Sequence, residues 1–246
     1  MKFILLSVLI STITICNGRV LPDSITGCKR SDPNLNQCST VLLNKLRPEI
    51  EKGIPSIKLP PIDPFKLNVV NIDKALEGIK ITGKFTDIVA AGGSKFIVEE
   101  VNLNPKTLDG KVKIKIPELK LSGGYDLNGK LLQIPLNIKG KMTGNFNGID
   151  AVVDLKSNEI DDKGVKRLKL TQITSKIKVG GGKLNLVESN AKNQQAADIA
   201  MNFFNENSAE VLQSVAPIID ETASQIIKSI LSEMLEVIPS EELFPN

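Results

Sequence analysis

The amino-acid sequence predicts an α+β fold in which a strongly curved antiparallel β-sheet wraps around a long C-terminal helix and encloses a hydrophobic tunnel. Two periodicities indicate it: apolar residues recur every second position from Phe65 to Val187, and every three or four positions from Ser189 to Ile238. A one-sided sheet and a broad-faced helix bury both apolar faces when the sheet curls around the helix. A tunnel is expected because one helix, about 10 to 12 Å across, does not fill a long curved sheet.

The N-terminal residues 1–18 are typical of a secretory signal peptide, with a charged start, a short apolar run and a small-residue exit at Gly18. Cleavage there removes Cys16 and leaves Cys28 and Cys38, which can pair in an oxidising compartment or remain free thiols. The sequence therefore predicts a secreted, extracellular monomer with one domain, residues 19–246.

A short amphipathic helix is expected from Asn36 to Lys52, which Pro48 should shorten or kink. The proline-rich run Gly53–Pro64 excludes a helix or a central strand. We expect it to be an extended connector that lies along the body.

Long antiparallel strands are expected between Phe65 and Val187, with one apolar and one lysine-studded face. The alternation changes phase after Pro117, which predicts a β-bulge at Pro117 or Glu118. Gly140 and Gly144 should permit the sheet to curve. Turn signals are expected to separate the strands. They are Asn104-Pro105, Asp109-Gly110, Gly123-Gly124, Asn128-Gly129, Asn147-Gly148, Asp161–Gly164 and Gly180–Gly182.

The C-terminal helix, Ser189–Ile238, is predicted to be a rod of about 70 Å at about 1.5 Å per residue. Charged residues interrupt its apolar runs well short of the roughly 20 residues that a bilayer-spanning helix needs. One apolar turn is replaced by Asn205–Ser208, which is a solvated bend, a polar spot at a tunnel mouth, or a break between two helices. Pro217 should kink the rod.

The candidate ligand-binding residues are the apolar side chains that the curled sheet and the helix turn inward. They are Val112, Ile114, Ile134, Leu136, Ile138, Met142, Phe146, Val153, Phe203, Phe204, Ile219, Ile226 and Ile230. For each of them, packing in a solid core is an equally good interpretation. Together they favour a tunnel, which would select a long hydrophobic ligand by shape and burial.

The composition argues against catalysis and against nucleic-acid binding. The chain has no histidine and no tryptophan, its one tyrosine is Tyr125, and its net charge is only +3. No pair of carboxylates or glycine-rich phosphate loop is evident, so we expect no catalytic residue, no metal and no cofactor. Lysines on the outer phase of the strands are expected to be solvated, and attraction to an anionic membrane is the alternative. They are Lys111, Lys113, Lys115, Lys120, Lys130, Lys139 and Lys141.

Several short motifs, in this order, resemble the takeout and juvenile-hormone-binding-protein family of insect secreted carriers. They are Cys28 with Cys38, Gly53-Ile54-Pro55, Pro60–Pro64, Pro117–Leu121 followed by Tyr125, Gly129–Leu132 with Pro135, and Leu243-Phe244-Pro245. The resemblance covers nearly all of the chain after residue 18. It implies a long helix wrapped in curved sheet around a hydrophobic tunnel, similar to the tubular lipid-binding superfamily, and ligands such as juvenile hormone, other terpenoids or fatty acyl chains.

Two functions follow as hypotheses. The first is a non-enzymatic carrier of a long hydrophobic ligand, with transient contact to a membrane or receptor. The alternative is a protein of defence or signalling that interacts with lipid or membrane surfaces.

Overall fold

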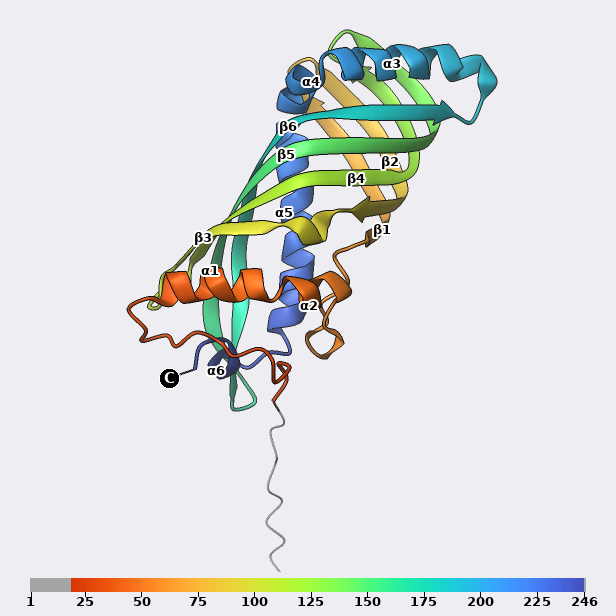
Figure 1. Cartoon of the computed structure of the whole chain (residues 1–246). Helices are drawn as coiled ribbons and strands as arrows, with labels where there is room; N and C mark the ends of the chain where they lie inside the picture. The colour runs from red at the N-terminus through yellow and green to blue at the C-terminus, as the bar shows by residue number, and fades with distance from the viewer. Residues whose placement is uncertain (1–18, 246) are drawn as a thin grey trace, which may run out of the picture.

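The computed structural model describes residues 19–245 (Figure 1). The predicted signal peptide, with Cys16, lies outside the described residues. The sheet has six antiparallel strands in the order β1-β2-β4-β5-β6, and β3 pairs with β4 beyond the end of β2. The strands are β1 (Phe65–Leu76), β2 (Ile79–Ala91), β3 (Ile97–Leu103), β4 (Gly110–Leu131), β5 (Ile134–Asp162) and β6 (Val165–Glu188).

The strands β4, β5 and β6 are much longer than the turn signals predicted. Gly123-Gly124, Asn128-Gly129, Asn147-Gly148 and Gly180–Gly182 all lie inside strands, so these predicted turns are wrong, whereas Asn104–Asp109 and Asp161–Gly164 mark true chain reversals. Close approach of neighbouring strands explains some of these glycines. A Cβ on Gly129 would overlap the carbonyl oxygen of Lys80.

Gly140 allows a second close approach, because a Cβ there would overlap the carbonyl oxygen of Val187. The strands bend strongly along their length (Figure 1). Gly140 thus lets β5 and β6 run closely together in the curved part of the sheet, in line with its predicted role.

The phase shift near Pro117 is real, but it is not a bulge between β4 and β5. Ile116 pairs with Ile149 and Glu118 with Asn147, so the register is unbroken. The alternation of buried and exposed residues along β5 also changes phase opposite Pro117, at Gly148, which has a φ of 60°. The change of phase therefore occurs at the same level in β4 and β5. We call this line across the two strands the crease.

Pro117 also lies where β4 has no strand beside it on the β2/β3 side. The last pair of β3 is Ile97 with Lys115, and the last pair of β2 is Ala91 with Lys120. A residue without a backbone N–H costs nothing in such a gap. The register shifts in this part of the sheet lie between Thr86 and Val89 of β2 and between Val98 and Glu100 of β3.

The prediction of one continuous C-terminal helix is wrong. The segment forms α3 (Gln194–Glu206), α4 (Ser208–Ser214) and α5 (Ala216–Leu235), which are separated by Asn207 and Val215. Asn207 leaves helical geometry at φ −123°, and its Nδ2 donates to the carbonyl of Phe203 at 2.9 Å. Pro217 lies in the first turn of α5, where its missing N–H does no harm.

The break turns α3 away from α5. In Figure 1, α3 lies across one end of the sheet, and α5 runs along the inside of the curve. Ile218 of α5 is buried against residues of β1, β2, β4 and β5. A curved antiparallel sheet around a C-terminal helix is therefore present, but that helix has 20 residues.

The N-terminal region closes the other end of the molecule. The helix predicted from Asn36 is split into α1 (Leu35–Lys45) and α2 (Arg47–Lys52), with Pro48 in the first turn of α2. Cys28 and Cys38 form a disulfide, as predicted. The connector is not simply extended, because Ile54 and Leu59 bridge around the 3-10 turn η1 (Pro55–Ile57).

Side chains from α1 take up the free backbone groups along the edge of β3. The three side chains lie one helical turn apart on α1 and accept hydrogen bonds from β3. Asn36 Oδ1 accepts from Leu103 N at 2.8 Å, Thr40 Oγ1 from Val101 N at 3.0 Å, and Asn44 Oδ1 from Val98 N at 3.0 Å. A sheet edge that would otherwise be open is thereby covered.

The β6 edge is covered in the same way by α3 and α5. The side chains of Gln194, Asn205, Ser224 and Asp220 accept hydrogen bonds from backbone N–H groups of β6. No helix covers the outer edge of β1 in this way within residues 19–245, so β1 is the open edge of the sheet.

Candidate ligand-binding site

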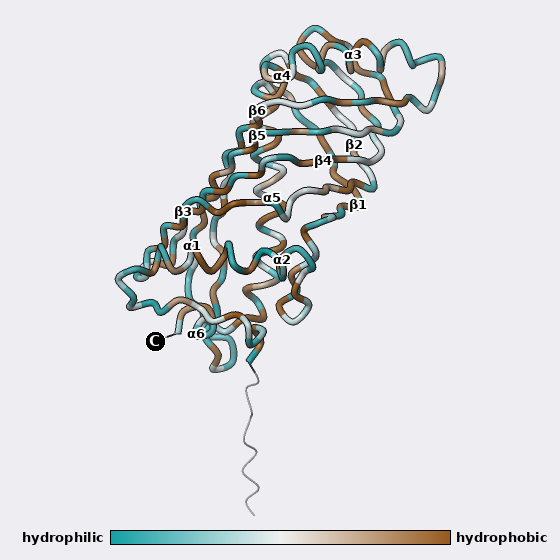
Figure 2. Tube along the Cα trace, in the orientation of Figure 1, coloured by the Kyte–Doolittle hydropathy of each residue, from teal (hydrophilic) through white to brown (hydrophobic). Residues whose placement is uncertain are grey.

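Four of the predicted residues lie in the part of the interior next to α3 and the start of α5. Leu136 and Ile138 are buried in one cluster, and Ile134 and Met142 pack against it. Facing them are Ala197 of α3, which is fully buried, and Ile218 at the start of α5. Hydrophobic and hydrophilic residues alternate along the strands (Figure 2). Along β5 this alternation places these side chains on the inner face, as the sequence predicted.

A second cluster lies where α3, α4 and the bent strands meet. Phe204 is buried, and Phe146, Phe203 and Ile219 pack against its cluster. The rings of Phe146 and Phe204 meet edge to face, with centroids 6.3 Å apart. Such aromatic pairs stabilise packing, so Phe204 has a structural role here.

Val112 and Ile114 lie apart from these residues. They pack in a third cluster with Phe96 and Val98, beneath α1 and α2. Val153 is buried opposite Val112 in the β4–β5 pairing. These predicted residues therefore lie in three regions of the interior. The reason is that the parts of β4 and β5 on the two sides of the crease face different helices.

The remaining predicted residues, Ile226 and Ile230, lie in the second half of α5 and are only partly buried. Ile218, which is 9% exposed, is the only buried residue of α5, although the sheet curves around this helix. A helix that is packed tightly on all sides would bury more of its apolar residues. The half-buried face of α5 thus has apolar surface that no side chain of residues 19–245 covers completely.

Tyr125 is the most informative polar residue of the interior, and the list of tunnel residues missed it. It lies on β4 in the apolar cluster that contains Leu136 and Ile138 and is only 3% exposed, yet its hydroxyl has no hydrogen-bond partner among residues 19–245. Burial, together with the nearby carboxylate of Glu188, raises the pKa of Tyr125 to about 12. A neutral hydroxyl that can still donate or accept a hydrogen bond therefore lies within apolar surroundings.

One feature of the sequence singles out Tyr125 as a candidate, namely that tyrosine is so rare in this chain. It is the only tyrosine of the chain, and it lies in a stretch that alternates toward the interior. Hydrophobicity alone does not identify such a side chain, which has an apolar body and a polar tip.

Comparison with known proteins places the chain in a family. Residues 4–245 match the family model described as haemolymph juvenile hormone binding protein (JHBP). The chain belongs to the takeout/JHBP family. The "Circadian clock-controlled protein daywake" of Drosophila melanogaster is 23% identical over 231 residues, which cover 91% of this chain and 88% of that protein. The protein of the same name from Drosophila yakuba is 22% identical over the same shares.

The crystal structure of Epiphyas postvittana Takeout 1 has the same fold. It superposes with a TM-score of 0.75 at 18% identity, covering 90% of this chain and all of that one. The predicted takeout-like fold is thereby confirmed. At this level of identity, the match supports the architecture and leaves the ligand to be argued from the residues.

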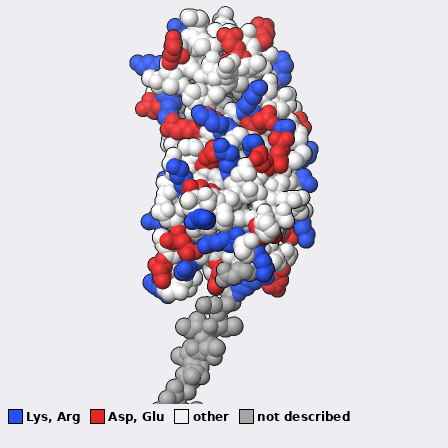
Figure 3. Space-filling view, turned by 90° about the vertical axis from the view of Figure 1, so that its left-hand side faces the viewer, with Lys and Arg blue, Asp and Glu red and all other residues white. Residues whose placement is uncertain are grey.

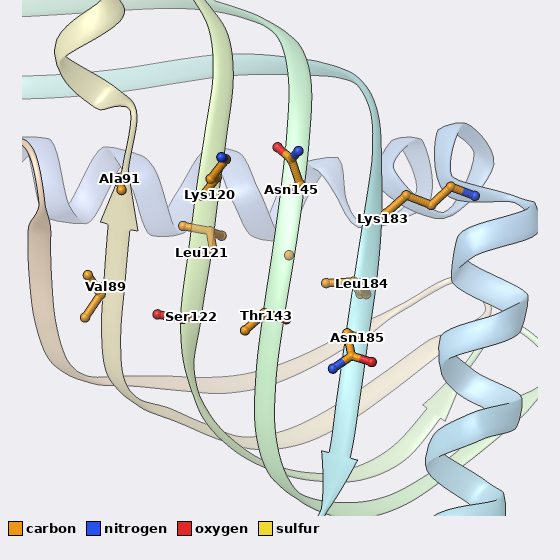
Figure 4. A pocket seen from close by; sticks show the side chains of 11 residues that line it. Val89, Ala91, Lys120, Leu121, Ser122, Thr143, Asn145, Lys183, Leu184 and Asn185 are labelled. Carbon is orange, nitrogen blue, oxygen red and sulfur yellow. The ribbon is translucent and has the colours of Figure 1, made fainter.

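The hollow of about 470 Å³ on this takeout-family protein lies on the outer face of the sheet (Figure 4). Lys120, Asn145 and Lys183 come from three neighbouring strands, and they pair directly in the β4–β5–β6 register. Directly opposed residues share one face of a sheet. These three side chains lie on the face opposite to that of Met142 and Phe146. The hollow is also lined by Leu121, Gly144 and Leu184, which occupy inner-face positions in the same register.

The lysine-bearing outer face is largely neutralised by carboxylates. Five of the seven lysines form ion pairs. Figure 3, which faces the left-hand side of the molecule in Figure 1, shows charges of both signs side by side. The pairs are Lys111–Asp154 (3.2 Å), Lys113–Glu100, Lys115–Glu99 (2.6 Å), Lys120–Glu118 (4.0 Å) and Lys139–Asp126 (3.0 Å). This pattern favours a solvated face over a cationic surface for anionic membranes.

Two further features bear on the class of site. Among residues 19–245, no three His, Cys, Asp or Glu side chains are grouped so that they could hold a metal ion. In the same part of the chain, no helix is both long enough and apolar enough to cross a membrane.

Proposed function

We propose that this takeout/JHBP family member is a secreted, non-enzymatic carrier that holds a long hydrophobic ligand between α5 and the concave face of the sheet. The observation that carries the proposal is the half-buried apolar face of α5, together with an apolar inner face of the sheet on which the Tyr125 hydroxyl has no hydrogen-bond partner among residues 19–245. The ligand class is a juvenile-hormone-like terpenoid, a fatty acid or another lipid. We expect the carrier to act as a monomer with one domain, residues 19–246, and without a cofactor.

The energetics favour such a ligand. Burial of an aliphatic chain contributes about 0.8 kcal/mol per methylene, so ten methylenes contribute about 8 kcal/mol before the entropic costs of binding. The family description supports a binding protein, because the matched model is named for juvenile hormone binding in haemolymph.

Within the interior, Tyr125 is the group that would orient the ligand. Its unpartnered hydroxyl has lost its hydrogen bonds to water, so a polar group of a ligand that reaches it restores a hydrogen bond. An ester, a carboxylic acid, an epoxide or an alcohol would each serve. A purely aliphatic ligand would leave the hydroxyl unpaired.

The alternative, a protein of defence or signalling that binds lipid or membrane surfaces, is less well supported. It needs a cationic or apolar docking face, and the lysines of the outer face are mostly paired with carboxylates. Absence of binding to anionic vesicles at low salt would remove this alternative.

Mass spectrometry of the solvent-extracted protein tests the carrier function. The expected result is a co-purified hydrophobic compound with at least one polar group, in a molar ratio near one. A protein that emerges empty and also fails to take up a fluorescent fatty acid would show that the proposal is wrong.

A further inference from the structure

The two adjacent residues Asp220 and Glu221 of α5 contact opposite edges of the sheet. Asp220 Oδ1 accepts a hydrogen bond from Ile177 N of β6 at 2.7 Å. Glu221 forms an ion pair with Lys74 of β1, with Nζ–Oε distances of 2.6 and 2.7 Å. The sheet therefore curls until its first and last strands meet the same turn of α5, and the helix closes the ring.

The contact of α5 with β6 is extensive. Ser175 N donates to Ser224 Oγ at 2.8 Å, and Ser175 Oγ donates to the carbonyl of Asp220 at 2.8 Å. Lys176 adds an ion pair to Asp220, whose side chain is only 13% exposed. Buried hydrogen bonds to a charged group are among the stronger contacts within proteins, so this side of the ring is fixed.

The contact of α5 with β1 is sparse. β1 pairs only with β2, and its outer edge carries none of the side-chain caps seen along β3 and β6 within residues 19–245. Lys74 lies opposite the buried Ile81, so it projects from the inner face of β1 toward α5. The ion pair is partly exposed, at 31% for Lys74 and 47% for Glu221.

We propose that the seam between β1 and α5 is the portal through which the hydrophobic ligand enters and leaves, and that the Lys74–Glu221 ion pair latches it. This inference rests on the proposed carrier function. Separation of β1 from α5 breaks one partly exposed ion pair, whereas separation of β6 from α5 breaks several buried hydrogen bonds. Ile226 and Ile230, the half-buried apolar residues, follow Glu221 on the same helix by five and nine residues.

Stopped-flow exchange of a fluorescent fatty acid tests the portal. The protein is compared with Glu221→Gln and Lys74→Met, and with Lys66→Met as the matched control on the same strand, since Lys66 lies on β1 and is exposed. Loss of an ion pair of this kind changes an opening equilibrium by about two- to fivefold. We expect both latch variants to bind and release the probe about two- to fivefold faster, with an unchanged Kd and an unchanged Lys66 variant.

A second arm closes the seam covalently. The double variant Lys74→Cys/Glu221→Cys, bridged by a short bis-maleimide after purification with the native disulfide intact, should slow probe exchange at least tenfold. The unbridged double variant should exchange as fast as the single latch variants. Reversal of the pair, Lys74→Glu with Glu221→Lys, should restore the slow exchange of the original protein.

The outcomes separate the two proposals. If the unmodified protein takes up no hydrophobic probe, the carrier function fails. If the probe binds but exchanges at the same rate in all variants, including the bridged one, the portal lies elsewhere and the carrier function stands. Faster exchange of the latch variants, together with a block in the bridged protein, supports the portal.

Discussion

Asp220 and Glu221 are neighbours in the sequence, yet Asp220 bonds to Ile177 of β6 and Glu221 pairs with Lys74 of β1, at the two ends of the strand order. The side chain of Asp220 is 13% exposed and that of Glu221 is 47% exposed. The sequence marked both only as charges that interrupt an apolar run. Their partners make one a structural anchor and the other a weaker contact.

The first prediction compares these two neighbours. Asp220→Ala should lower the free energy of unfolding by about 2 to 3 kcal/mol, because it leaves the backbone N–H of Ile177 unpaired and removes the ion pair with Lys176. Glu221→Ala should lower it by less than about 1 kcal/mol, since the lost ion pair is partly exposed. Urea denaturation measures both values. Equal losses would contradict the difference between the two seams.

The second prediction concerns Tyr125. Tyr125→Phe removes a buried hydroxyl that has no partner, so it should stabilise the ligand-free protein by about 1 kcal/mol. The same variant should bind a ligand with a polar head about two- to tenfold more weakly, because one hydrogen bond is lost. Calorimetry with a fatty alcohol and with an alkane of equal length separates the effects. An equal loss for both ligands would show that Tyr125 does not orient the ligand.

The third prediction concerns Asp63, which ties the connector to the turn after β2. Its carboxylate accepts hydrogen bonds from Gly92 N at 3.0 Å, from Ser94 N at 3.1 Å and from Ser94 Oγ at 2.6 Å. Burial opposes ionisation of Asp63. The hydrogen bonds from Ser94 and Gly92 outweigh burial and hold the pKa below its usual value.

A carboxyl with a lowered pKa in the folded state stabilises the protein above its unfolded pKa, and this stabilisation is lost as the pH falls through the folded pKa. Asp63→Asn should therefore cost about 1 to 3 kcal/mol at pH 7 and progressively less below about pH 4. Urea denaturation at pH 7, 4 and 3 checks this. A cost that does not change with pH would contradict the role of the ionised group.

The fourth prediction concerns the cover of the β3 edge. Asn44 accepts from Val98 N at 3.0 Å, and its Nδ2 donates to the carbonyl of Val98 at 2.8 Å. Asn44→Ala should lower stability by about 1 to 3 kcal/mol, because both groups of Val98 lose a partner. Hydrogen exchange at Val98 should rise, whereas exchange at Leu103, which Asn36 covers, should change less. Unchanged exchange at Val98 would show that α1 does not depend on this contact.

The sequence predicted the architecture well because each strand alternates over a long reach, and alternation depends only on which face is buried. It offered a break at Asn205–Ser208 only as one of three interpretations, since apolar pairs continue at helical spacing on both sides of Asn207. The break is fixed by contacts that the spacing does not encode, such as the bonds from Asn205 to Leu184 of β6. The same limit applies to Gly129, where a turn signal marks a close approach of strands instead.

The sequence predicted which side chains of the candidate site point inward, but not which region of the interior each of them occupies. Leu136 and Ile138 point inward as expected, yet Val112 and Ile114 belong to a different cluster because the strands crease near Pro117. Such division depends on how the sheet bends in three dimensions. Tyr125 could have been included by its phase on β4, had polar-tipped side chains been considered.

The central claim, that the space beside α5 binds the ligand, is tested most directly by filling that space. Ile226→Trp/Ile230→Trp adds bulk on the half-buried face of α5, and Ile160→Trp/Ile199→Trp adds the same bulk at positions that are 40% and 50% exposed. The measurement is the Kd for a fluorescent fatty acid, with folding checked by circular dichroism. We predict at least a tenfold weaker affinity for the first variant and an unchanged affinity for the second. Equal affinities for both variants and for the original protein would contradict the account.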